Sequence, residues 1–495
     1  VDCMDFRLPA DDDPRRLAVR EWLARNPNPT GRRLAEAGYV VAHWPAPWGL
    51  SADPEHQLIV DDELRRAKVR GPDNPIGIGW AGPTIAYAGS AEQKDRYLMP
   101  LLSGEEYWCQ LFSEPVAGSD LAALGTRAVR DGDEWVVNGQ KICTSGAQIA
   151  KFGILIARTD PTVAKHRGIS YFICPMDLAG IEIRPITEMT GGQMFNEVFF
   201  TDVRIPAANL VGAENDGWRL TKVTLANERV SLSTGGVLWG SGPTGLDVVD
   251  LIRSTGPVTD PRLRQRIAAV YTEHTILDLI RLRTLTARLQ GRQPGPEASV
   301  RKLLADEHGQ HVMALARDCI GAWGLLRRVG TDTSASGGLG ALDQETGLGG
   351  LMHPGWYDGF MFAPALTIGG GTWAVQRNII GERVLGLPAE PDPTAGQPWG
   401  HSPGSRREGY LRSSLRRRPP MRASQTATAT ITAPEAMIKT GARPSPGKKW
   451  VMAHGTFTSR PADPLSDIST RPGMVPRAIR PTAVTRPKMV AIATD

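Results

Sequence analysis

The sequence predicts an α+β protein in which two helical regions flank a β-rich module. Apolar residues recur at helical spacing up to about residue 110 and again after Gly217, whereas short alternating runs occupy about residues 121 to 212. This order differs from the strand–helix alternation of a doubly wound sheet. We therefore expect a helical domain at 1–110, a β domain at 111–213, a helical domain at 214–390 and a tail at 391–495.

The individual elements follow from local spacing and turn residues. The helices predicted from apolar residues on one face cover residues 14–24, 58–67, 263–289 and 297–326. The strands predicted from alternation cover residues 126–130, 134–138, 154–158, 170–174 and 197–200. Asp131-Gly132-Asp133 separates the first two strands, and an Asp-Gly pair in that position predicts a hairpin turn.

The cysteines and the apolar content limit the class of protein. Hydrophobic residues make up 41% of the 495-residue chain, which is ample for a core, but no apolar run is long enough to span a membrane. The first residues, Val1 to Asp13, lack the basic-then-apolar order of a signal peptide. The five cysteines are scattered and show no CxxC spacing, so we expect a cytoplasmic location, no disulfide framework and no thiolate metal site.

The net charge of +5 is unevenly distributed along the chain. From Pro391 onward the chain has 17 Lys and Arg and 6 Asp and Glu, a net charge of +11. The whole chain has 57 Lys and Arg and 52 Asp and Glu, so the residues before Pro391 have 40 and 46, a net charge of −6. The predicted folded part therefore gives no electrostatic reason to expect nucleic-acid binding.

The tail has the composition of a disordered segment. It contains 15 Pro among its 105 residues, with many Thr, Ser, Ala and Arg and no apolar periodicity, so it buries too little apolar surface to fold. Arg416-Arg-Arg-Pro-Pro could be a patch for an anionic partner or an unselected basic stretch. The abrupt change suggests an out-of-frame or read-through extension. An intact mass of the native protein would decide this hypothesis.

Two short motifs have weak support as functional sites. Gly77-Ile-Gly-Trp-Ala-Gly82 matches the dinucleotide pattern G-x-G-x-x-G, but it lacks a preceding β-branched strand, so a helix–loop element is the better interpretation. His308 and His311 can share a helix face without a clear third ligand nearby, which favours a structural role over a metal site.

Three other segments combine small residues with hydrogen-bonding groups. Ser113-Glu-Pro-Val-Ala-Gly-Ser-Asp120 opens the β module, and Asn138-Gly-Gln-Lys-Ile-Cys-Thr-Ser145 joins a tight turn to two hydroxyls. Gly369-Gly-Gly-Thr372 precedes the helical run from Trp373, so its backbone N–H groups can face an anion or an electron-rich ring edge. Each alone could be a plain turn or cap. Together and in this order they indicate a ligand site.

With these segments the chain resembles the acyl-CoA dehydrogenase family over about residues 4 to 390. The matching stretches are 113–120, 134–141 and Gly371-Thr372 followed by Gln376-Arg-Asn-Ile-Ile-Gly-Glu-Arg-Val-Leu-Gly-Leu. The resemblance implies an N-terminal helical domain, a middle β-barrel-like domain and a C-terminal four-helix bundle. It also implies that FAD lies between the domains and across a subunit interface.

The resemblance implies a catalytic carboxylate in one of two places. One place directly precedes the Gly-Thr of the closing motif, and here it is occupied by Gly370. The other lies on the first long helix of the C-terminal domain, directly before an Arg, and Glu228-Arg229 fits it. We therefore expect Glu228 to be the base and Arg229 to be a neighbouring charge. The alternative is an exposed Glu–Arg pair on a solvated helix face.

The resemblance also assigns groups to the flavin and the thioester. The N–H of Gly370, together with a ribityl hydroxyl of the flavin, is expected to polarise the thioester carbonyl. The residues that the resemblance places at FAD are Leu111, Ser113, Gly118, Ser119, Cys143, Ser145, Gly371 and Thr372.

The chain departs from the family pattern at three points. Cys143 stands where Trp usually contacts the flavin, and Ala374 replaces the usual Glu or Gln. The Arg-x-x-Phe-Gly motif is absent, and the stretch from Thr259 to Arg266 offers several arginines instead. Losses of this kind resemble subunits of heteromeric dehydrogenases that act on sterol side chains.

The expected activity is α,β-dehydrogenation of an acyl-CoA, with electrons passed to an electron-transfer flavoprotein. We expect a homotetramer or an α2β2 assembly. The alternatives are an acyl-CoA oxidase and a structural subunit that completes a partner's FAD site.

Overall fold

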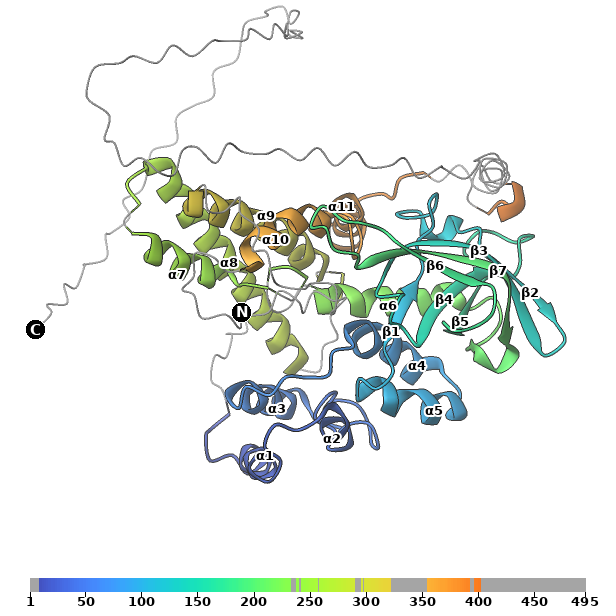
Figure 1. Cartoon of the computed structure of the whole chain (residues 1–495), viewed down its shortest axis with the longest axis horizontal. Coiled ribbons are helices and arrows are strands. Elements are labelled where there is room, and N and C mark those ends of the chain that lie inside the picture. The colour runs from blue at the N-terminus through green and yellow to red at the C-terminus, as the bar shows by residue number, and fades with distance from the viewer. Residues whose placement is uncertain are drawn as a thin grey trace, which may run out of the picture. The chain divides into compact units, whose positions relative to one another are not determined.

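The computed structural model describes residues 9–232, 237–239, 242–256, 258–289, 295–296, 298–321, 354–391 and 396–401. Over these ranges helical segments precede and follow one β-sheet, which confirms the predicted α+β class (Figure 1). The predicted tail beyond residue 401 and the end of the predicted helix at 297–326 lie outside the described residues.

The N-terminal helices begin at capping residues that the sequence supplies. They are α1 (Pro14–Arg25), α2 (Gly31–Glu36), α3 (Pro54–Arg66), α4 (Gly82–Ala88) and α5 (Ala91–Leu102). The Asp13 carboxylate accepts the N–H of Arg15 at the start of α1, and Ser90 and Gln93 form a capping box on α5. The helices predicted at 14–24 and 58–67 are thereby confirmed as α1 and α3.

The G-x-G-x-x-G segment is helical. Residues Gly77–Ala81 form a π-helical turn that runs directly into α4. A Cβ on Gly77 would lie 2.2 Å from the Nδ2 of Asn74, so packing against this side chain accounts for that glycine. Asn74 in turn donates to the carbonyl oxygens of Leu101 and Glu106. The segment therefore packs inside the protein, in agreement with its interpretation as a helix–loop element.

The β domain is one eight-stranded sheet. Its strands are β1 (Trp108–Leu111), β2 (Arg127–Asp131), β3 (Glu134–Ser145), β4 (Phe152–Arg158), β5 (Ile169–Pro175), β6 (Ile181–Pro185), β7 (Phe195–Pro206) and β8 (Leu210–Val211). They run in the order β6-β7-β3-β2-β4-β5-β8, with β1 paired in parallel to β4. All seven residues of β4 are buried, as expected of a central strand. Asp131 pairs with Glu134 in the predicted hairpin.

The helices of the C-terminal part follow the sheet. They are α6 (Gly217–Leu232), α7 (Gly245–Thr255), α8 (Pro261–Leu289), α9 (Ala298–Ile320), α10 (Pro354–Phe362) and α11 (Trp373–Ile379). Helix α6 contacts β5, α4 and α9, so it lies between the sheet and the remaining helices (Figure 1). Short 3₁₀ or π-helical turns cover Leu121–Ala123, Ala207–Asn209, Ala363–Thr367, Ile380–Val384 and Trp399–His401.

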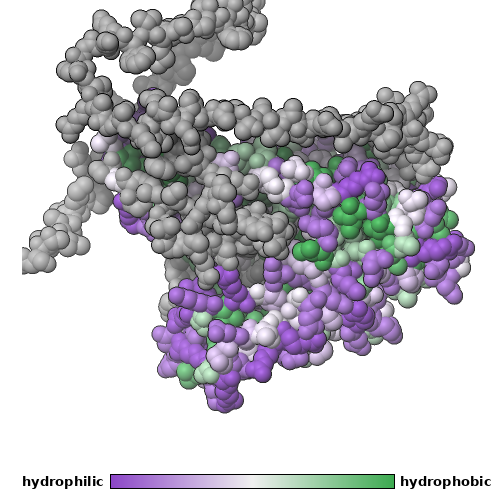
Figure 2. Space-filling view, viewed as in Figure 1, coloured by the Kyte–Doolittle hydropathy of each residue, from purple (hydrophilic) through white to green (hydrophobic). Residues whose placement is uncertain are grey.

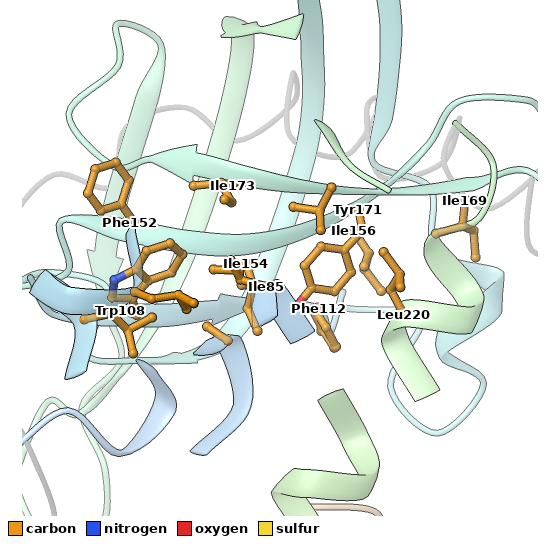
Figure 3. Packing of buried hydrophobic residues seen from close by; sticks show 14 of the residues in the cluster. Ile85, Trp108, Phe112, Phe152, Ile154, Ile156, Ile169, Tyr171, Ile173 and Leu220 are labelled. Carbon is orange, nitrogen blue, oxygen red and sulfur yellow. The ribbon is translucent and has the colours of Figure 1, made fainter. Parts of the chain in front are cut away.

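One hydrophobic cluster joins the sheet to α4 and α6. Trp108 of β1 and Phe152 of β4 stack at 5.1 Å between ring centroids, and Tyr171 of β5 meets Phe112 edge-on at 6.1 Å (Figure 3). Ile85 and Leu220 enter the same cluster from the two helices. Burial of these large side chains fixes α6 against the sheet.

Residues 396–401, inside the predicted tail, pack against the β domain. The indole of Trp399 lies over the guanidinium of Arg158, 4.6 Å from Cζ to the ring centroid, and is 7% exposed. The N–H groups of Trp399 and Gly400 donate to the carbonyl oxygens of Val163 and Pro161 at 2.8 and 3.0 Å. This short segment is therefore an ordered part of the tail.

The visible surface is mixed in character. Hydrophilic residues dominate the visible surface of the N-terminal helices, and hydrophobic residues gather over the sheet close to α11 (Figure 2). Near the end of the helical part, between residues 368 and 387, three apolar side chains are exposed: Ile368 by 67%, Leu385 by 66% and Leu387 by 57%. Across the described ranges, each helix is too short or too polar to cross a membrane.

Candidate active site

Glu228 lies on the buried face of α6. The buried residues of this helix are Gly217, Leu220, Thr221, Thr224 and Glu228, a spacing that places them on one side. The hydroxyl of Thr224 bonds to Thr84 of α4 at 2.8 Å and to Tyr171 of β5 at 3.0 Å, which fixes the rotation of the helix. Glu228 is 6% exposed, so it does not lie on a solvated face.

The surroundings of Glu228 favour its neutral form. Burial raises the pKa of the Glu228 carboxyl above its ordinary value. Three weaker influences oppose this shift: the Nε2 of Gln110, which donates to Oε2 at 3.2 Å, and the charges of Lys302 and Arg229. A buried carboxyl with a raised pKa is the type of group that works as a general base near neutral pH.

The glycine segment 369–371 meets α6 one helical turn beyond Glu228. Gly370 and Gly371 have φ values of +67° and +85°. A Cβ on Gly370 would lie 2.6 Å from the Cδ1 of Leu232 and 3.0 Å from the Cε of Lys302. A side chain at position 370 would therefore have to displace the ends of Leu232 and Lys302, whereas Glu228 already places a carboxyl group on the facing helix.

The two motif segments at the start of the β domain are joined by a buried ion pair. Lys141 donates to the Oε1 of Glu114 at 2.8 Å and to the carbonyl oxygen of Phe112 at 3.0 Å. Glu114 also accepts the N–H groups of Gly125 and Thr126. Burial alone would raise the pKa of Glu114, but Lys141 and these hydrogen bonds hold it below its usual value.

The other predicted cofactor residues lie in two groups. Leu111 is the last residue of β1 and Ser113 follows it, and the carbonyl oxygen of Ser113 accepts the N–H of Ile142, so this strand end is bonded to β3. Ser145 ends β3 opposite Phe195. By contrast, Gly118 and Ser119 lie in an exposed turn, and a Cβ on Gly118 would meet no atom within 4 Å.

Cys143 lies at an interruption of the ladder between β3 and β7. It has a φ of +57° and its side chain reaches the surface. Partial loss of hydration raises the pKa of its thiol, and the negative charge of Glu197 adds to this effect. Because the thiolate is the reactive form, we predict slow alkylation by iodoacetamide at neutral pH and faster alkylation at higher pH. Peptide mass spectrometry should find buried Cys109 and Cys174 unmodified, and added FAD should slow the reaction at Cys143. Rapid modification at neutral pH would contradict this prediction.

Sequence reasoning missed three residues of the site. Gln110 bonds to Glu228 across 118 positions, and Lys302 reaches both Asp306 and the glycine segment. No pattern in the sequence marks these two. Lys141 lies inside a segment that its resemblance already identifies, but nothing in that segment shows that its charge is buried.

The two histidines on α9 share one carboxylate. The Nδ1 atoms of His308 and His311 lie 3.0 and 2.9 Å from the two carboxylate oxygens of Glu273 on α8. Within the described residues, no cluster of His, Cys, Asp or Glu could hold a metal ion. A cleft next to this group is lined by residues that include Leu232, Trp239, His274, Arg301, Asp306 and His308.

The arginines in the stretch from Thr259 to Arg266 differ in their contacts. Arg266 pairs with Asp318 at 2.6 Å, whereas the Arg262 side chain is 91% exposed beside Asp260. Arg264 reaches the carbonyl oxygen of Val258 at 3.5 Å. Arg262 and Arg264 are thus better placed than Arg266 to meet a phosphate from outside the chain.

The glycine segment suits the polar edge of a flavin. Gly370 and Gly371 both have positive φ values, a turn conformation in which successive backbone N–H groups can bind electron-rich groups. Within the described part of the chain, the N–H groups of Gly370, Gly371 and Thr372 have no hydrogen-bond partner. Donors without an internal acceptor are what the predicted FAD contacts require.

Comparisons with known proteins match all three domains. The chain matches the acyl-CoA dehydrogenase N-terminal domain at residues 14–105, the middle domain at 109–203 and the C-terminal domain at 215–385. Acyl-CoA dehydrogenase FadE34 of Mycobacterium tuberculosis is 41% identical over 356 residues, 72% of this chain but only 45% of the relative's length. Acyl-CoA dehydrogenase IpdE1 of the same organism is 37% identical over 360 residues, 72% of this chain and 87% of the relative.

Solved structures share the fold. The Tcur3481-Tcur3483 steroid ACAD is 30% identical with a TM-score of 0.61 and covers 78% of this chain and 100% of its own. The ChsE4-ChsE5 complex from Mycobacterium tuberculosis is also 30% identical, with a TM-score of 0.59 and the same coverage. The domain matches, the relatives and the site together show that the chain belongs to the acyl-CoA dehydrogenase family, whose members are FAD-binding oxidoreductases that act on acyl-CoA thioesters.

Proposed function

We propose that the chain catalyses the α,β-dehydrogenation of an acyl-CoA to a trans-2-enoyl-CoA, with Glu228 as the base. The observation that carries this proposal is the position of Glu228: a buried carboxyl with a raised pKa, on the helix that meets the glycine segment. The neighbouring position 370 cannot supply the base, because glycine has no carboxyl side chain.

The residues divide the work between the proton and the developing charge. When bound, FAD supplies the acceptor for the hydride that leaves the β carbon. Glu228 removes the α proton, and Gln110 holds one carboxylate oxygen in place. The N–H of Gly370 donates to the thioester oxygen, where negative charge grows as the α C–H bond breaks. The flavin would be held by Gly371, Thr372, Leu111, Ser113, Cys143 and Ser145. Gly118 and Ser119 would have to approach the flavin from their exposed turn.

We further propose that the chain works in an assembly, either a homotetramer or an α2β2 heterotetramer, and transfers electrons to an electron-transfer flavoprotein. One similar structure is a complex of two differently named chains. Helix α8 exposes Tyr271, Ile276 and Leu279 by 54%, 43% and 43%, and exposed apolar side chains of this size mark contact surfaces.

A second candidate is a structural subunit that completes a partner's FAD site. The missing Arg-x-x-Phe-Gly motif favours it, because a phosphate contact that the family uses is not in its usual place. An acyl-CoA oxidase is the third candidate, and Cys143 in place of Trp favours it by leaving space beside the flavin.

One experiment separates these candidates. The full-length protein is purified with FAD, and its visible spectrum is recorded without oxygen before and after addition of acyl-CoAs of different size. Bleaching of the flavin bands supports a dehydrogenase, and rapid peroxide formation on admission of air supports an oxidase. A folded but colourless protein would favour the structural subunit.

The rate of flavin reduction should depend on the ionisation of Glu228. Only the carboxylate can accept the α proton, and burial raises its pKa. We therefore predict that the rate rises with pH through a pKa above the ordinary range of glutamate and then reaches a plateau. Stopped-flow reduction of the flavin across pH measures this limb. A rate that is independent of pH down to about 4, the ordinary pKa of Glu, would contradict the prediction.

A further inference from the structure

The carbonyl groups of three successive glycines are each held by a buried side chain. Lys302 Nζ donates to the oxygen of Gly369 at 3.0 Å and to that of Leu366 at 3.3 Å. Gln376 Nε2 donates to the oxygens of Gly370 and Gly371 at 3.0 and 3.2 Å. Both donor side chains are 0% exposed, so water does not compete for these bonds.

These bonds also determine where the N–H groups point. A trans peptide is planar, and its N–H is directed opposite to its C=O. The carbonyls of Gly369, Gly370 and Gly371 share their peptide planes with the N–H groups of Gly370, Gly371 and Thr372. The N–H groups of Gly370, Gly371 and Thr372 therefore point away from the side chains of Lys302 and Gln376. On that opposite side these N–H groups have no partner among the described residues.

Lys302 reaches this position at an energetic cost. It is fully buried and paired with Asp306, one turn along α9, at 2.5 Å. A buried ion pair is often no more stabilising than apolar residues of the same size, because both charges lose their hydration. Asp306 itself has a pKa raised to about 7 by burial. Because Lys302 also donates to the glycine segment, an effect on that segment is a reason for placing the ion pair here.

We propose that Lys302 and Gln376 are positioning residues for the reaction: Lys302 directs the N–H of Gly370 at the thioester oxygen, and Gln376 directs the N–H groups of Gly371 and Thr372 at the flavin. This inference rests on the proposed function for what the N–H groups bind. The orientation of the peptides themselves does not depend on it.

The test compares matched variants of the full-length protein loaded with FAD. The double variant Lys302→Met/Asp306→Leu removes the donor without leaving a buried charge. The control Arg16→Met/Glu63→Leu removes a buried ion pair between α1 and α3, far from the glycine segment in the sequence.

The Lys302 double variant should lose about 10²- to 10³-fold in kcat, the usual effect of losing one oxyanion donor, with KM changed by less than about threefold. The control should keep kcat within about threefold of the wild type. Equal kcat in the double variant and the control would overturn the proposal. Gln376→Leu should instead lower the affinity for FAD, and unchanged FAD affinity would overturn its role.

A crystal structure of the double variant supplies a reading that needs no substrate. A rotated Gly369–Gly370 peptide supports the positioning role even if no acyl-CoA bleaches the wild-type flavin, in which case only the proposed function fails. An unrotated peptide overturns the role of Lys302. If the double variant does not fold, the structure and kcat of Lys302→Arg, which displaces the donor but keeps the charge, decide by the same criteria.

Discussion

Replacing Glu228 by Gln should lower the rate of flavin reduction by acyl-CoA by about 10²- to 10⁴-fold, the usual contribution of a general base. Glutamine keeps the shape of the side chain and can still bond to Gln110, but its amide cannot accept the α proton. FAD content should not change, because Glu228 is not among the residues expected to bind it. Anaerobic stopped-flow absorbance measures the rate.

Three further observations separate loss of the base from general damage. Glu228→Gln replaces a buried ionisable group by a neutral one, so its thermal stability should equal or exceed that of the wild type. Glu214→Gln, an exposed substitution shortly before α6, should leave the rate unchanged. The wild-type protein should also exchange the acyl α proton with D2O, and the variant should not. Reduction by Glu228→Gln within about tenfold of the wild type would exclude Glu228 as the base.

Much of the fold could be predicted because its elements are encoded locally. Helix α8 has a long run of helical spacing without Pro or Gly after its first residue, and the β2–β3 hairpin has Asp-Gly at its turn. β1 was not predicted, because its four residues, Trp-Cys-Gln-Leu, show no clear alternation. Its only recorded partner in the described sheet, β4, lies about 40 residues further along, so it is stabilised by tertiary contacts.

The site was only partly predictable for the same physical reason. Glu228 was found because an acidic residue before Arg on that helix resembles the family pattern, and the structure adds that it is buried. Its partner Gln110 and the charge of Lys302 come from β1 and α9, and no local pattern can reveal which side chains the fold brings together. Gly118 and Ser119 match a motif and lie in an exposed turn, so their contact with FAD stays a prediction.

Replacing Lys141 by Met should destabilise the β domain by about 3–5 kcal/mol, the range expected when one partner of a buried ion pair is removed. The Lys141 side chain is 0% exposed and that of Glu114 is 6% exposed, so the carboxylate would remain buried with only the two backbone donors. Urea unfolding followed by tryptophan fluorescence measures the change. Lys165→Met, which removes a lysine paired with the exposed carboxylate of Asp120, is the matched control and should cost less than about 1 kcal/mol.

The pH dependence of this variant tests the cause of the loss. In the wild type the pKa of Glu114 is lowered, so the pair contributes stability above the unfolded pKa and loses it as pH falls through the folded pKa. Without Lys141, burial is the main remaining influence and raises the pKa of Glu114, so protonation at acid pH relieves the unpaired charge. The difference in stability between wild type and Lys141→Met should therefore shrink as pH falls below about 5. A difference that stays constant with pH would mean that lost packing of the lysine stem, and not the unpaired carboxylate, destabilises the domain.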